Sequence, residues 1–177
     1  MSLPSLVTPR LMLRSFTQAD AETVKLLAGA TEVAQHTTNI PHPYQIEHAQ
    51  EWISTHATDF DNRRNLTLAI QENKSNQLIG CISLRLDDAN FKAEMGYWLG
   101  VPYWGRGYAT EAGAALIRYG FEHLNLNRIA AYHFASNPAS GRVMQKIGMT
   151  REGQLRQNVF KDGAFHDAVV YGILRQP

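Results

Sequence analysis

The chain has 177 residues, and we expect a single domain over residues 1–177 because this length can bury a sizeable core. Its 17 lysine and arginine residues balance 16 aspartate and glutamate residues, which argues against nucleic acid as a partner. One cysteine, Cys81, excludes an internal disulfide framework and favours the cytoplasm. The seven histidines show no ligand spacing and no apolar run could span a bilayer, so we expect neither a metal nor a membrane partner.

The first part of the chain predicts one strand and two helices. Leu11 and Leu13 alternate with other residues, as in a strand with one buried face. Thr17 is a suitable cap for a helical pattern that follows it. After a polar loop, apolar residues at helical spacing predict a second helix. The expected elements are a strand in residues 6–16, a helix in 17–30 and a helix from Gln45 to about Asn62.

The remainder of the chain predicts a meander, two more helices and a final hairpin. Three β-rich segments are joined by short polar connections, and a helix with small residues on one face follows two glycines. An Asp-Gly pair within Lys161–Ala164 marks a hairpin turn. The expected elements are strands in 65–70, 77–86 and 92–100, a helix ending near 123–127, a strand in 128–134, a helix in 137–148 and two strands within 151–174.

The order of these elements, β α α β β β α β α β β, indicates a mixed sheet. A strand, a helix and a strand in succession imply at least one parallel pair, whereas a meander and a hairpin are antiparallel. The predicted fold class is therefore α/β (α+β mixed), with about seven strands and helices on both faces of the sheet.

The stretch "PYWGRGYATEA" places Gly105 and Gly107 at the start of a helix. Unshielded amides and the positive end of a helix dipole together favour an anion such as phosphate or pyrophosphate. No lysine closes a nucleotide P-loop here, and no dinucleotide fingerprint is present. The alternative is a glycine turn that only caps the helix.

This stretch resembles the pyrophosphate motif of the GCN5-related N-acetyltransferases (GNAT superfamily), with Gly107 and Ala109 at its last two marked positions. Trp104 stands where the family has Arg or Gln. With "TPRLMLR", "AEMGYWLG" and "SNPASGRVMQKIGM", the whole chain is similar to the branch of the ribosomal-protein-serine and ribosomal-protein-alanine N-acetyltransferases (RimJ/RimL-like). The resemblance implies the GNAT fold, whose strongly twisted sheet opens between two parallel strands, here 92–100 and 128–134, to admit acetyl-CoA.

The resemblance also assigns residues to acetyl-CoA. Amides of the opened strand bind the pantetheine arm and polarise the acetyl carbonyl, and amides of the glycine loop hold the pyrophosphate. Asn137 contacts the cosubstrate in the family, although it is equally suited to cap the next helix. Arg142 and Lys146 lie one turn apart and either meet the phosphates or form a solvated helix face. The residues assigned to acetyl-CoA binding are Tyr97, Trp98, Leu99, Gly105, Arg106, Gly107, Tyr108, Ala109, Thr110 and Asn137.

Two side chains are candidates for catalysis. Ser140 matches the family position that protonates the sulfur of coenzyme A. The glutamate expected as general base in the ribosomal-protein-serine enzymes is replaced by Val159. Glu94 is the nearest substitute, because several superfamily members carry a catalytic glutamate on this strand. Its alternative is an exposed carboxylate paired with Lys92 or Arg85.

The implied function is direct, acetyl-CoA-dependent transfer of acetyl to the N-terminal α-amine of a protein, including a ribosomal one. An α-amine is roughly 10% neutral at pH 7, so a weak base suffices. His42 and Tyr44 fall where the family shapes its acceptor pocket, although a plain surface loop explains them too. The alternatives are acetylation of a small amine, such as a polyamine or an aminoglycoside, and a non-catalytic acyl-CoA-binding or sensing domain. A homodimer is a further expectation.

Overall fold

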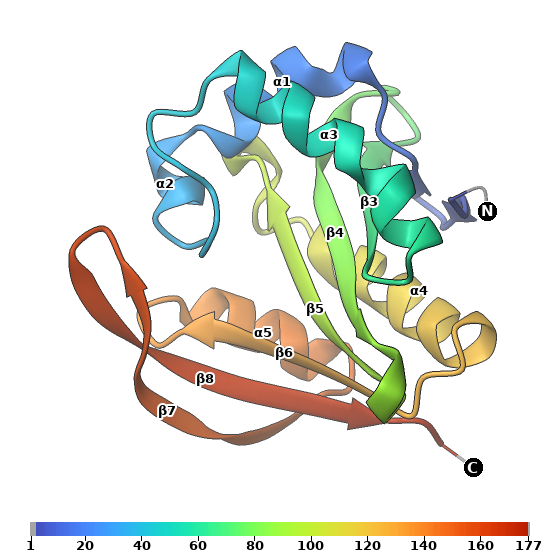
Figure 1. Ribbon diagram of the computed structural model, residues 1–177, viewed down its shortest axis with the longest axis vertical. Coiled ribbons are helices and arrows are strands. Elements are labelled where there is room, and N and C mark those ends of the chain that lie inside the picture. Colours follow the sequence, from blue (N-terminus) through green and yellow to red (C-terminus); the bar gives the residue numbers. More distant parts are fainter. Residues whose placement is uncertain (1–2, 177) are drawn as a thin grey trace.

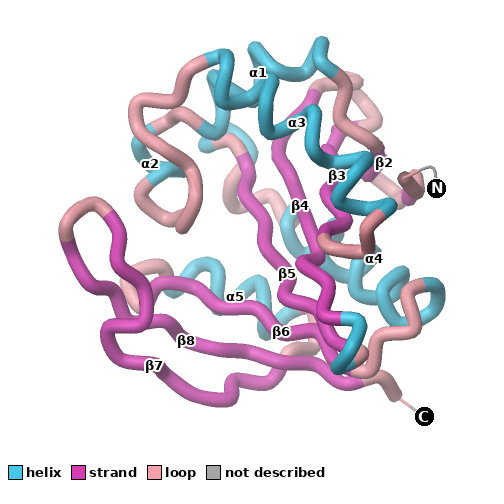
Figure 2. Tube along the Cα trace, viewed as in Figure 1, coloured by secondary structure: helices cyan, strands magenta, loops and turns pink. Residues whose placement is uncertain are grey.

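The computed structural model describes residues 3–176 and shows one mixed sheet with helices on both faces, as predicted (Figures 1 and 2). The strands are β1 (Leu6–Val7), β2 (Leu11–Arg14), β3 (Asn65–Glu72), β4 (Leu78–Asp87), β5 (Lys92–Leu99), β6 (Arg128–Phe134), β7 (Thr150–Lys161) and β8 (Ala164–Leu174). The helices are α1 (Ala21–Ala28), α2 (Thr31–Ala34), α3 (Ile46–Asp61), α4 (Tyr108–His123) and α5 (Pro138–Lys146). Short 3-10 turns are η1 (Gln18–Asp20), η2 (Asp88–Asn90) and η3 (Val101–Tyr103).

The sheet has eight strands in the order β1-β2-β3-β4-β5-β6-β8-β7, rather than the seven expected. The additional strand arises because residues 6–16 form a small hairpin instead of one strand. The amide of Thr8 donates to the carbonyl of Leu11 (2.9 Å), and the amide of Leu11 donates to Thr8 Oγ1 (3.0 Å). Pro9, which cannot donate within a ladder, lies inside this turn. A turn residue in the middle of an alternating pattern therefore splits the strand.

The region before the long loop also differs from its prediction. Thr17 caps the 3-10 turn η1, with its amide donating to Asp20 Oδ2 (2.8 Å), and α1 begins only after this turn. The four-residue helix α2 was not predicted, because one turn of helix is too short to display a period.

Two apolar clusters lie on the two faces of the sheet. Because side chains of a strand alternate, Leu68 and Ile70 of β3 contact the larger cluster under α4, whereas Ala69 contacts the cluster beneath α1 and α3. Figure 1 shows α1 and α3 in front of β3 and β4, with α4 behind them. The sheet is thus buried on both faces in its first half.

The parallel strands β5 and β6 separate soon after they meet. They pair only over Lys92–Glu94 and Arg128–Ala130, and the rest of β5 then diverges from β6 (Figure 1). All other neighbouring strands are antiparallel. The sheet therefore opens between its two halves, which confirms the prediction of an opening between these two strands.

Candidate active site

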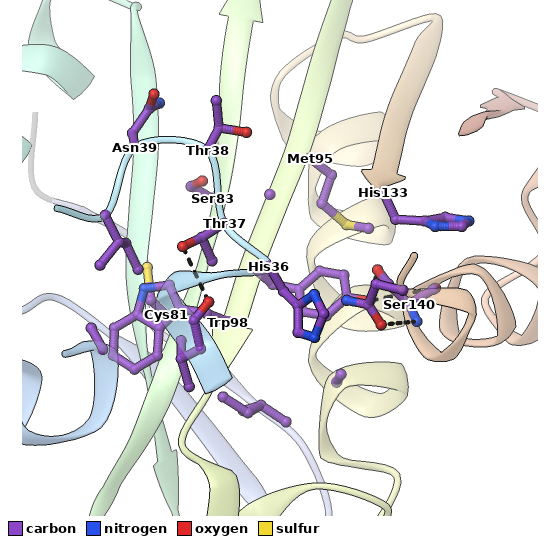
Figure 3. Close-up of a pocket in the computed structure, with 18 of the residues that line it drawn as sticks. His36, Thr37, Thr38, Asn39, Cys81, Ser83, Met95, Trp98, His133 and Ser140 are labelled. Carbon is purple, nitrogen blue, oxygen red and sulfur yellow. Dashed lines mark hydrogen bonds between the residues drawn. The ribbon is translucent and has the colours of Figure 1, made fainter. Parts of the chain in front are cut away.

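A cavity of about 1020 Å³ lies where β5 and β6 separate. Its walls come from the sheet, from the first turns of α5, from α3 and from the segment that follows α2 (Figure 3). Segments from both halves of the chain therefore form one site, and its size suits a ligand of several hundred Å³ together with a second substrate.

The floor of the cavity is the face of β3, β4 and β5 that turns toward α3. Antiparallel register places side chains of the three strands in rows across this face. The first row is charged and polar, the second carries hydroxyl groups, and the third is apolar. The rows are Asn65, Arg85 and Glu94; Thr67, Ser83 and Gly96; and Ala69, Cys81 and Trp98.

Glu94, the candidate general base, lines the cavity and is 38% exposed. Its Oε1 lies 3.1 Å from Nη2 of Arg85, the residue directly opposite on β4. Lys92 pairs with Asp87 instead (3.4 Å). The carboxylate therefore both faces the cavity and forms the pairing with Arg85 that the sequence left as the alternative.

Ser140, the candidate acid, lies in the first turn of α5 and lines the cavity. Asn137 caps this helix by accepting from the amide of Ser140 at Oδ1 (3.4 Å), and it too lines the cavity. The hydroxyl of Tyr97 on β5 lies 2.7 Å from Ser140 Oγ. Burial raises the pKa of Tyr97, and the hydrogen bond with Ser140 only partly offsets that rise.

The glycine loop leads into α4 beside this cavity. Gly105 and Gly107 have φ of 73° and 79°, a backbone conformation that residues other than glycine rarely adopt. Gly107 is the N-cap of α4 and no described side chain caps it, so the first amides of the helix are left without intrahelical acceptors. Gly105 and Ala109 line the cavity. This arrangement provides bare amides at a positive helix end, as an anion requires.

Of the other loop residues, Trp104 lines the cavity, whereas Arg106, Tyr108 and Thr110 do not. Tyr108 is buried on the far side, where its hydroxyl donates to Glu72, so only its backbone belongs to the loop. Arg106 and Thr110 provide no lining side chain. Trp104, which replaces the family's Arg or Gln, lines the cavity and donates from Nε1 to the carbonyl of Leu99 (2.7 Å). Trp104 therefore ties the loop to the end of β5.

Arg10, in the turn between β1 and β2, donates hydrogen bonds to the glycine loop and to the first turn of α4. Its Nη1 donates to the carbonyl of Arg106 (2.9 Å), and its Nε donates to Glu111 Oε2 in the first turn of α4 (2.6 Å). The same guanidinium lies 4.7 Å from the ring centroid of Tyr108. One cation thus joins the loop, the helix and the edge of the sheet.

Two polar atoms that the sequence did not single out also belong to the cavity. His36 Nδ1 and Asn65 Oδ1 are buried without a hydrogen-bond partner among residues 3–176, and both residues line the cavity (Figure 3 labels His36). Each is an isolated polar residue with no motif around it, so only the fold reveals that it lies at the cavity with a buried, unpaired polar atom. Buried polar atoms are normally paired, which makes both candidates for substrate contacts.

The remaining candidates are placed as follows. Val159 is buried on β7 opposite His166 and does not line the cavity. Cys81 is buried in the cavity floor, and burial raises the pKa of its thiol. Tyr44 lines the cavity, whereas His42 is exposed outside it.

Arg142 and Lys146 are exposed on α5 outside the cavity lining. Within residues 3–176, no cluster of three or more His, Cys, Asp or Glu side chains is arranged to hold a metal ion. None of the described helices combines the length and the apolar character needed to cross a membrane.

Comparisons with known proteins agree with this geometry. A family model described as an acetyltransferase (GNAT) domain matches residues 10–150. The chain is 34% identical over 173 residues to the uncharacterized N-acetyltransferase YoaA of Bacillus subtilis, with 97% of each chain covered. It is 35% identical over 99 residues to the ribosomal-protein-serine acetyltransferase of Escherichia coli, with 55% of each covered. The solved microcin C7 self-immunity acetyltransferase MccE, in complex with acetyl-CoA and AMP, has a TM-score of 0.85 at 24% identity, covering 95% of this chain and 94% of that one.

Proposed function

The chain belongs to the GNAT acetyltransferase family and is an acetyltransferase, and we propose that it transfers acetyl from acetyl-CoA directly to the N-terminal α-amine of a protein. Ribosomal proteins are the proposed acceptors, because one relative that matches about half of the chain is a ribosomal-protein-serine acetyltransferase. We place this activity in the cytoplasm, and a homodimer stays a prediction.

The separation of β5 from β6 is the observation that carries the proposal. Beyond the pair of Glu94 with Ala130, the β6-facing backbone groups of β5 have no strand partner in the described sheet. Tyr97, Trp98 and Leu99 lie in this stretch and line the cavity; they pair with β4, so only the alternate backbone groups directed at β6 lack a strand partner. Unpaired amides of this kind bind the pantetheine arm and stabilise the oxyanion that develops on the acetyl carbonyl.

The glycine loop supplies the second half of the acetyl-CoA site. The free amides of the first turn of α4 and the helix dipole attract the pyrophosphate, and Gly105 lets the backbone approach it closely. Since the single N–H of Trp104 donates to the carbonyl of Leu99, this side chain does not bind the pyrophosphate as an arginine or glutamine at the same position would. In this chain the pyrophosphate is therefore held mainly by backbone groups, with Arg106 as the nearest cation of the loop.

Ser140 and Glu94 act at the reacting atoms in this proposal. The neutral amine attacks the thioester carbonyl; as the C–S bond breaks, its electron pair moves to sulfur, which takes the hydroxyl proton of Ser140. The amine nitrogen loses one proton as the amide forms, and that proton returns to Ser140 through Glu94 and water. Glu94 is suited to this step because it faces the cavity from the polar row of the floor.

The experiment that tests the function offers acetyl-CoA with peptides that begin with Ser, Ala, Met or Lys, and with spermidine. A peptide with a blocked N-terminus and an internal lysine is the matched control. Free thiol and the mass of each acceptor are measured together. We expect thiol release and a gain of one acetyl group with free α-amines only. Acetyl-CoA binding without thiol release from any acceptor would instead identify a sensing domain, and transfer to spermidine alone would identify a small-amine acetyltransferase.

A further inference from the structure

Two hydroxyl groups meet across the opening of the sheet. Tyr97 lies on β5 beyond its last pair with β6, and Ser140 lies on α5, the helix that follows β6. Tyr97 Oη is 2.7 Å from Ser140 Oγ, and both residues line the cavity. The contact therefore connects the two halves of the sheet at the place where their backbones no longer pair.

Hydrogen bonds of the amide fix the backbone of Ser140, but they do not fix the direction of its hydroxyl hydrogen. The amide of Ser140 donates to the side-chain oxygen of Asn137 (3.4 Å) and to its carbonyl (3.2 Å). These bonds place the Cβ atom of the serine, while rotation about the Cα–Cβ and C–O bonds still allows several directions for the hydroxyl hydrogen. A further partner is needed to select one direction, and Tyr97 Oη is the side-chain atom within hydrogen-bond distance of Ser140 Oγ.

Only one of the two hydroxyls can donate in this contact, because each carries a single hydrogen. Tyr97 Oη also lies 3.5 Å from the carbonyl of Ser140, which can only accept. The carbonyl of Ser140 can only accept, whereas Oγ can accept or donate, so the phenol hydrogen has two acceptors within reach and Oγ is the nearer one. A tyrosine phenol, whose ordinary pKa is near 10, keeps its hydrogen at neutral pH, and burial raises the pKa of Tyr97 further. When Tyr97 donates, the hydrogen of Ser140 is free to bond a third atom.

We propose that Tyr97 is a positioning residue for Ser140: its phenol donates to Ser140 Oγ and thereby directs the serine hydrogen toward the sulfur of acetyl-CoA. This inference rests on the proposed function. The proton that reaches sulfur as the C–S bond breaks is still that of Ser140, and the proton lost by the amine still replaces it. Tyr97 stays a neutral phenol throughout and adds no proton of its own.

The test is a double-mutant cycle of Tyr97→Phe and Ser140→Ala, in which kcat and the KM for acetyl-CoA are measured with the best acceptor peptide. Loss of one neutral hydrogen bond predicts a fall in kcat of roughly 3- to 10-fold for Tyr97→Phe, with KM little changed. In the Ser140→Ala background, the same substitution has no serine hydroxyl to position, and we expect no further loss of kcat.

Tyr132→Phe is the matched control. Tyr132 lines the same cavity, but its hydroxyl lies 2.9 Å from Thr38 Oγ1 instead of Ser140. The fold-change in kcat caused by Tyr132→Phe should be the same in the wild-type background and in the Ser140→Ala background. Thermal unfolding of each variant monitors folding, and Tyr97→Leu, which also lacks the hydroxyl, repeats the comparison if the phenylalanine variant does not fold.

The outcomes separate this inference from the function on which it rests. A wild-type enzyme that transfers acetyl, with equal losses from Tyr97→Phe in both backgrounds, would overturn the positioning role alone. A rise in KM without a fall in kcat would also overturn it, since Tyr97 would then only contact acetyl-CoA. A wild-type protein that transfers no acetyl to any amine would overturn the proposed function and, with it, this inference.

Discussion

At the scale of single residues, the proposed acetyl-CoA site depends on backbone groups that glycine exposes. Gly105 has φ of 73°, and a Cβ atom added there would meet no heavy atom within 4 Å. The requirement for glycine is therefore conformational rather than steric, because an L side chain destabilises this left-handed backbone by about 1–2 kcal/mol.

Gly105→Ala is expected to weaken acetyl-CoA binding by roughly 5- to 30-fold, because the loop must regain its strained conformation on binding. Isothermal titration calorimetry measures the change. Gly163→Ala is the matched control: Gly163 has φ of 80°, equally open surroundings and a position in the β7–β8 turn. Equal affinities for the two variants would show that the glycine loop does not hold the pyrophosphate.

Single residues also mark the limit of what the sequence predicted. The resemblance indicated that Ser140 and Glu94 are candidate catalytic residues, but it assigned Tyr97 to acetyl-CoA through backbone amides and gave its ring no role. Strand alternation assigns Tyr97 and Trp98 to opposite faces, and only the separation of β5 from β6 lets both line one cavity. The unpaired Nδ1 of His36 was also beyond prediction, because only the fold brings the segment after α2 to this cavity.

At the scale of elements, Arg10 connects three parts of the site. Its bonds to the Arg106 carbonyl and to Glu111 join the β1–β2 turn, the glycine loop and the first turn of α4. This side chain is about half exposed, so its ion pair contributes little to global stability. Its main effect should be to hold the loop in the conformation that binds the pyrophosphate.

Arg10→Gln is therefore expected to weaken acetyl-CoA binding by about 3- to 10-fold while leaving the unfolding temperature nearly unchanged. Arg63→Gln is the control, because Arg63 forms a comparable exposed pair with Asp88 away from the loop. Calorimetric titration and thermal unfolding are run on both variants. An affinity loss of the same size in Arg63→Gln would contradict the role assigned to Arg10.

Most elements were predictable because their patterns are long. The helix expected from Gln45 to about Asn62 is α3 (Ile46–Asp61), and the final hairpin turns between β7 and β8 as expected. The three differences concern short elements: Pro9 interrupts the first strand pattern, the 3-10 turn η1 precedes α1, and α2 is a single turn. The opening of the sheet was inferred from the resemblance to a family, since neither spacing nor composition shows where two parallel strands separate.

At the scale of the whole molecule, stability should depend on pH through His56. This residue of α3 is buried between Phe16 and Trp52, with both ring nitrogens unpaired among the described residues. Burial lowers its pKa from 6.5 to about 4, although Asp59 opposes this effect. Between these values the unfolded chain binds a proton that the folded chain does not, so the free energy of unfolding decreases as pH falls from 6.5 to 4.

His56→Phe, which keeps a ring against Phe16 and Trp52, should remove this part of the pH dependence. Urea unfolding of both proteins at pH 7 and pH 4.5 measures it. Between pH 7 and pH 4.5, the free energy of unfolding of the wild type is expected to decrease by up to about 3 kcal/mol more than that of the variant. An identical loss in the two proteins would mean that His56 is protonated equally well in the folded state.

Acetyl-CoA is proposed to occupy the opening between the two halves of the sheet, and both the transfer and the roles of Ser140 and Tyr97 depend on this position. A crystal structure of the protein with coenzyme A tests this claim most directly. It should place the pyrophosphate on the amides at the start of α4 and the pantetheine arm along residues 97–99 of β5. The sulfur should then lie within hydrogen-bond distance of Ser140 Oγ. Coenzyme A bound elsewhere, or with its sulfur remote from Ser140, would contradict the account.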